Sequence, residues 1–199
     1  MRAFNVTEGA TTPPTDVDVF RFLDSTHQQI DLQLIRLTLL VERLEHRQLT
    51  ADERQQGQEV IAFFRQDARL HHQDEERHIL PSLLNSVDLA TADIARRLQQ
   101  DHQWLEQIWL TIDSSIDAAV SGSQWFDQQE LAHAAGMYTS LYADHMILEE
   151  TIAYPHAHRS LSPALLLGAS RDLARRWASR QRGSAGARNQ GPRDDGSPK

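Results

Sequence analysis

Two copies of a histidine–glutamate motif are the residues best suited to chemistry in this 199-residue chain. The first copy pairs His71 with Glu75, and the second pairs His145 with Glu149. Residues four apart on an α-helix share one face, so each imidazole would lie beside a carboxylate. Imidazole and carboxylate together are typical ligands of metal ions such as iron and manganese. The motif therefore predicts a metal site that is built from helices.

The motif belongs to a longer internal repeat. Both copies read His-x3-Glu-Glu-x4-Pro. A further histidine precedes each copy, because His27 lies 44 residues before His71 and His102 lies 43 residues before His145. We therefore expect two helical hairpins, each of which contributes one lone histidine and one histidine–glutamate pair. Asp24 and Asp101, close to the lone histidines in sequence, are candidate hydrogen-bond acceptors behind the site.

Six side chains of this repeat fall on the apolar stripes of the predicted helices. Charged or strongly polar groups in a dry core are costly unless they are paired, and six at one depth would conflict with the fold. A pair of metal ions resolves the conflict, because two carboxylates can bridge two ions and four imidazoles can supply two ligands to each. A zinc site and a metal-free bundle with polar layers are the alternatives. The predicted ligands are His27, His71, Glu75, His102, His145 and Glu149.

Composition narrows the kinds of site that are possible. The chain has no cysteine, which excludes disulfide bonds, thiolate zinc sites and cysteine-ligated iron–sulfur clusters. Any metal must be held by histidine or carboxylate, and the chain has 10 histidines. The net charge of −8, with positive residues gathered near the C-terminus, argues against nucleic acid as the main partner. The N-terminus lacks a secretory apolar core, and no apolar run approaches the roughly 20 residues that span a bilayer, so we expect a cytoplasmic protein.

Four long amphipathic helices would position the six side chains. Apolar residues recur at steps of three and four, and each stripe carries one of the four histidines. Thr50 with Glu53 fits a capping box for the second helix, and Asp127 can cap the fourth. Pro81 and Pro155 are expected to end the second and fourth helices. Short connections between long helices predict an antiparallel four-helix bundle in an all-α protein.

The bundle is expected to span residues 16–157. Residues 1–15 are predicted to be a disordered segment, and 158–182 to form an additional short C-terminal helix that opens at Ser162-Pro163 and continues to about Arg180. Residues 183–199, rich in Gly, Ser and Pro, are predicted to be a disordered tail.

These motifs resemble the hemerythrin-like (HHE cation-binding) family. The similarity covers about Asp16 to Ala157 and rests on the two His-x3-Glu-Glu-x4-Pro motifs and the two lone histidines. Family members are four-helix bundles with a carboxylate- and oxo-bridged di-iron centre. The resemblance therefore implies one iron on His27 and His71, a second on His102 and His145, and bridges from Glu75 and Glu149.

Two positions separate this chain from the oxygen-carrying members of the family. The carriers have a fifth histidine one turn before the one that matches His102, where this chain has Leu98, and an aspartate in place of Glu149. Four histidines and two glutamates are closer to the bacterial di-iron proteins that repair iron–sulfur clusters. Those proteins usually have a cysteine-bearing N-terminal segment, which this chain is not expected to have.

The predicted function is a di-iron protein that reacts with a small ligand (oxygen, nitric oxide or peroxide) in sensing, storage or stress defence. An iron–sulfur cluster repair-type protein is one alternative. A peroxidase- or oxidase-like enzyme is another, and it would need a proton donor near the metals, for which Tyr138 and Tyr142 are the nearest candidates. In a third alternative the metal is structural, and the C-terminal helix and basic tail bind a protein partner that the sequence does not identify.

Overall fold

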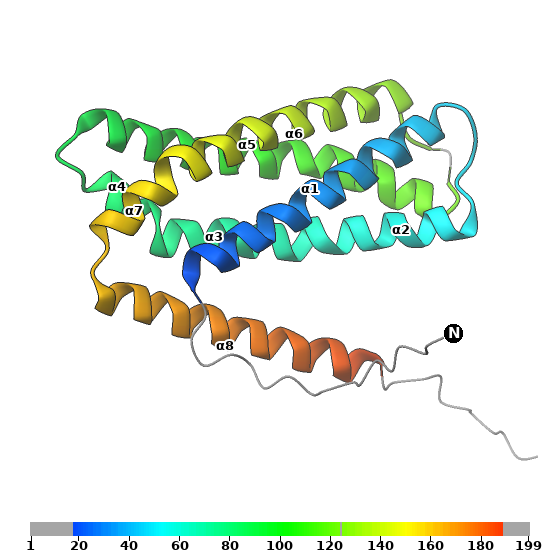
Figure 1. The fold of residues 1–199 in the computed structure, drawn as a ribbon. Helices are drawn as coiled ribbons and strands as arrows, with labels where there is room; N and C mark the ends of the chain where they lie inside the picture. The colour runs from blue at the N-terminus through cyan, green and yellow to red at the C-terminus, as the bar shows by residue number, and fades with distance from the viewer. Residues whose placement is uncertain (1–17, 124, 189–199) are drawn as a thin grey trace, which may run out of the picture. The chain divides into compact units, whose positions relative to one another are not determined.

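A computed structural model describes residues 18–123 and 125–188 of the chain. Within this part every regular element is helical and there is no strand, which confirms an all-α protein (Figure 1). None of the helices in the described residues is long and apolar enough to cross a membrane. The segment predicted to be disordered at 1–15, and the part of the predicted tail from 189 onward, lie outside the described residues.

Eight α-helices and two π-helical stretches are described. The α-helices are α1 (Val19–Leu44), α2 (Ala51–Ala62), α3 (Arg69–His78), α4 (Leu80–Leu84), α5 (Leu89–Val120), α6 (Gln128–Leu148), α7 (Tyr154–Ser160) and α8 (Pro163–Arg188). The π-helical stretch η1 (Phe63–Ala68) joins α2 to α3, and η2 (Glu149–Ala153) joins α6 to α7. Both π-helical stretches therefore lie in the two segments that carry the histidine–glutamate motifs.

Helix α3 ends at His78, close to the end expected at Pro81, but the short helix α4 follows it, and the fourth helical segment continues past Pro155, contrary to our expectation. Pro81 and Pro155 lie in the first turns of α4 and α7, which continue to Leu84 and Ser160. Proline is tolerated there because its missing N–H would have no partner inside the helix. Helical structure therefore continues past both prolines.

Residues Phe20–Ser162 form one compact unit, and helix α8 belongs to a second. Helix α8 begins at Pro163, as the sequence predicts, but runs to Arg188 instead of ending near Arg180. No proline interrupts the chain between Pro163 and Pro192, so nothing in the sequence forces an earlier end.

One hydrophobic core joins α1, α2, α5 and α6, which Figure 1 shows lying alongside one another as a helical bundle. Phe64 of η1 contacts Trp109 and Tyr138, with ring centroids 4.8 and 5.3 Å away. Burying each large apolar side chain contributes about 1.5–3 kcal/mol. This apolar packing can offset the cost of the buried polar residues described below.

The turn between α1 and α2 carries the capping box that the sequence predicts. The Thr50 hydroxyl accepts from the Glu53 N–H at 3.3 Å, and the Glu53 carboxylate accepts from the Thr50 N–H at 2.8 Å. Arg47 donates to both Glu53 oxygens at 2.7 Å. The first turn of α2 is therefore held at a fixed place by side chains. Asp127 caps α6 in the expected way, by accepting from the N–H groups of Gln129 and Glu130.

We expect Thr50→Ala to lower the free energy of unfolding by about 1 kcal/mol, because the first turn of α2 loses its cap. The matched control is Thr38→Ala, whose hydroxyl bonds the Leu34 carbonyl inside α1 at 3.0 Å. Alanine favours the helix interior, so this control should cost little or nothing. Chemical denaturation of both variants measures the difference, and equal losses would contradict the role of the cap.

Candidate metal centre

The six side chains predicted from the sequence meet inside the bundle. All six are buried, and both glutamates have no exposed surface. They are supplied by five elements: His27 by α1, His71 and Glu75 by α3, His102 by α5, His145 by α6 and Glu149 by the first residue of η2. Side chains that are far apart in sequence therefore converge at one depth of the core.

Glu75 extends one carboxylate oxygen to each side of the cluster. Its Oε1 lies 3.3 Å from Nε2 of His71, and its Oε2 lies 3.5 Å from Nε2 of His102. Two donor atoms that bind one ion at a right angle, each about 2.1 Å from it, lie about 3 Å apart. The spacing on both sides of Glu75 therefore suits shared ligation of an ion.

Glu149 likewise places one carboxylate oxygen beside a histidine on each side of the cluster. Its Oε2 lies 3.2 Å from Nε2 of His27, and its Oε1 lies 3.1 Å from Nε2 of His145. The six residues thus form two overlapping groups, each with two imidazoles and both carboxylates. The donor atoms within each group lie within 4.8 Å of one another. Each group is close enough to hold a metal ion.

Most of the atoms that face the centre have no hydrogen-bond partner, which tests whether a metal fits. Nε2 of His71, His102 and His145 and both carboxylate oxygens of Glu149 are buried without a partner. Buried polar atoms without a partner are uncommon in folded proteins because they are costly. A cation among these lone pairs would satisfy them together, so the donor set fits a metal ion.

The second glutamate of each Glu-Glu pair accepts a hydrogen bond from the lone histidine of the other repeat. Nδ1 of His27 donates to Glu150 at 2.8 Å, and Nδ1 of His102 donates to Glu76 at 3.0 Å. A carboxylate can only accept, so both protons lie on Nδ1 and each Nε2 keeps a lone pair for the centre. Asp101, which precedes His102 in the sequence, approaches Nδ1 of His145 at 3.8 Å.

Electrostatics favours positive charge in this cluster. Burial alone would lower the pKa of His27, but the contacts with Glu149, Glu75 and Glu150 raise it to about 9. Burial is likewise outweighed at His145, where Glu149 and Asp101 raise the pKa to about 9. At His71, burial prevails and lowers the pKa to about 4. The carboxylates therefore attract cations, either as protons on imidazole or as metal ions.

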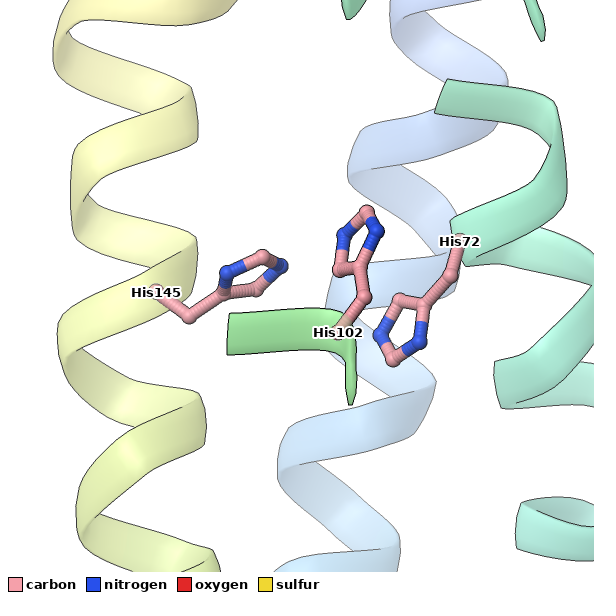
Figure 2. A group of neighbouring side chains, drawn as sticks. All are labelled: His72, His102 and His145. Carbon is pink, nitrogen blue, oxygen red and sulfur yellow. The ribbon is translucent and has the colours of Figure 1, made fainter. Parts of the chain in front are cut away.

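His72 is a buried neighbour of the cluster that helical spacing does not predict. Its side chain is 5% exposed, and its ring stacks on His102 with centroids 4.2 Å apart and planes 11° from parallel (Figure 2). His72, His102 and His145 are also close enough to hold an ion. Two imidazoles stacked this closely cannot both direct the lone pairs of their ring nitrogens at one ion. The observed orientation therefore makes His72 a packing partner of His102.

The tyrosine nearest to the predicted ligands is Tyr154, and neither Tyr138 nor Tyr142 has that position. The Tyr142 hydroxyl contacts Nε2 of His72 at 3.2 Å. The Tyr154 hydroxyl donates to the Glu75 carboxylate and lies 3.0 Å from Nε2 of His27. Sequence reasoning passed over Tyr154 because a residue five positions after Glu149 leaves the motif face in a regular α-helix.

Two hollows lie next to the cluster. A cavity of about 480 Å³ is lined by His72 and Tyr142 together with the aromatic rings of Phe64, Trp109 and Tyr138. A second hollow, of about 600 Å³, has a more acidic lining that includes His27, Tyr154, Asp24, Asp31 and Glu150. The cluster is therefore buried but lies close to spaces that a small molecule or a cation can enter.

A helical bundle whose core holds four imidazoles and two carboxylates defines a class of cation-binding protein. Comparison with known families agrees, because the model of the hemerythrin HHE cation-binding domain matches residues 18–157. The chain belongs to this family. It is also similar to an uncharacterised protein of Haemophilus influenzae, with 23% identity over 130 residues that cover 65% of this chain and 73% of the relative.

Glu149→Ala should abolish high-affinity metal binding, because it removes one carboxylate oxygen from each group of donors. Glu150→Gln is the matched control, since its amide oxygen can still accept from Nδ1 of His27. Loss of an outer partner typically costs 10–100-fold in affinity, and keeping the acceptor should cost less. Isothermal titration with ferrous or manganous ion measures both, and equal affinities for the two variants would contradict the assignment of Glu149.

Proposed function

We propose that this chain is a non-haem di-iron protein, with the site in an antiparallel four-helix bundle, and that it reacts with oxygen, nitric oxide or peroxide in sensing, storage or stress defence. One observation carries the proposal: both carboxylates place one oxygen among the imidazoles of each group. A carboxylate with oxygens on two sides is suited to bridging two ions. The proposed ligands are His27 and His71 on one ion, His102 and His145 on the other, and Glu75 and Glu149 on both.

The proposed reaction with a small ligand requires iron in place of zinc. Each group offers two imidazole nitrogens and two carboxylate oxygens. Four donors would complete the tetrahedral site that structural zinc prefers, whereas six-coordinate iron would keep positions for exogenous ligands. Bound iron supplies one-electron redox chemistry and those open positions. Thiolate ligands are excluded because the chain has no cysteine.

The protein's own side chains keep the site ready for small reactants. Glu76 and Glu150 orient His102 and His27 through Nδ1, so that both imidazoles present Nε2. Leu23 and Leu98, one turn before the two lone histidines, are fully buried and exclude water from that side. The cavity beside His72 and Tyr142, lined by aromatic rings as well as charged side chains, is large enough for a diatomic molecule to approach the site. These features support reaction with a small ligand over binding of a large substrate.

Metal analysis after aerobic purification tests this proposal most directly. We expect about two irons per chain, as dinuclear sites in helical bundles hold, together with oxo-to-iron charge-transfer absorption. Stoichiometric zinc, or no metal after loading with ferrous iron, would overturn it. The double variant Glu75→Ala, Glu149→Ala is the control, because it lacks both bridges and should bind no iron pair.

A further inference from the structure

We propose that Tyr154 is an additional protein ligand of the metal held by His27 and His71, bound as a phenolate, so that the two metal positions differ chemically. The inference rests on the proposed function, since it needs an ion at that position. It adds a donor that the duplicated motif does not contain.

The phenol hydroxyl of Tyr154 lies among the donor atoms of one group. Its hydroxyl lies 3.0 Å from Nε2 of His27 and donates to Oε1 of Glu75, so it touches two donor atoms of one group. The phenol ring stacks on the His27 imidazole, with centroids 5.5 Å apart and planes 22° from parallel. The side chain is only 5% exposed. The polar atom of Tyr154 is therefore directed at two donor atoms of the proposed metal position.

The backbone explains how Tyr154 reaches this place. In η2 the Tyr154 N–H bonds the carbonyl of Glu149, five residues earlier, which is the hydrogen bond of a π-helix. In a regular α-helix, a residue five positions on is rotated by about 140° from the first. The wider π-turn reduces this rotation, so that Glu149 and Tyr154 face the same centre. Single π-turns occur often at functional sites.

The first copy of the motif lacks both features. There the Ile79 N–H bonds the carbonyl of Glu75, four residues earlier, so this turn is α-helical. The residue that matches Tyr154 is Leu80, which is fully buried and has no donor atom. At the other group of donors, which includes His102 and His145, the additional imidazole is His72, and it stacks nearly parallel to His102. The phenol is therefore present at one metal position only.

Ligation as a phenolate changes the expected properties of that position. The phenol would lose its proton to solvent, and the oxygen lone pair would form the bond to the ion. Phenolate is a hard, anionic donor and favours the ferric over the ferrous state. It also produces phenolate-to-iron(III) charge transfer, which gives visible absorption and enhances tyrosine ring vibrations in resonance Raman spectra.

The experiment compares iron-loaded, oxidised wild-type protein with Tyr154→Phe and Tyr142→Phe. Tyr142 is the matched control, because it is also buried beside a histidine of the site, but its hydroxyl contacts His72. We expect a visible phenolate band with enhanced tyrosine modes in the wild type and in Tyr142→Phe. Tyr154→Phe should lose both signals and keep its iron, since the four histidines and two glutamates remain.

Iron binding without tyrosine modes in the wild type would overturn the assignment of Tyr154 and leave the di-iron proposal intact. Retention of the band in Tyr154→Phe would overturn it as well. Absence of bound iron in the wild type would instead refute the di-iron proposal. Circular dichroism checks that the variants fold. If Tyr154→Phe does not fold, resonance Raman spectra of Tyr142→Phe decide, because absent tyrosine modes there overturn the assignment.

Discussion

The contact between two buried carboxylates and four buried imidazoles is the constraint on which the rest of this protein depends. Glu75 and Glu149 have no exposed surface, and buried charge of this kind is stable only when it is closely paired. The imidazoles that pair with them come from α1, α3, α5 and α6, so all four helices must reach the same depth. The apolar core between α1, α2, α5 and α6 holds the helices at that depth.

The two halves of the site are linked through the second glutamate of each motif. Glu76 holds His102, and Glu150 holds His27, so each half orients a histidine of the other. If either helical segment moved along its axis, the hydrogen bond between its second glutamate and the histidine of the other repeat would be lost. The reciprocal arrangement accounts for the Glu-Glu pair in both motifs, since one carboxylate faces the centre and the next one faces an imidazole.

The duplication is imperfect, and its departures are chemical. The π-turn of η2 follows the second motif and brings Tyr154 against His27 and Glu75, whereas the matching position in the first motif is Leu80. The π-helical stretch η1 precedes the first motif. Within that motif, His72 is buried beside His102. The side of the site with His27 and His71 thus has a phenol at the centre, and the side with His102 and His145 has the His72 imidazole behind it. This asymmetry gives the two groups of donor atoms different chemical surroundings.

The sequence by itself determined which side chains meet and that helices carry them. The repeated spacing of His71 with Glu75 and of His145 with Glu149, with apolar residues at steps of three and four, depends only on α-helical geometry, which is local. The capping box at Thr50 is local for the same reason. Only the tertiary structure decided the roles of Glu76, Glu150 and Tyr154. The two glutamates act across helices that are far apart in sequence. Tyr154 reaches the centre through a π-turn, whose five-residue hydrogen bond changes the helical phase on which the spacing argument depends.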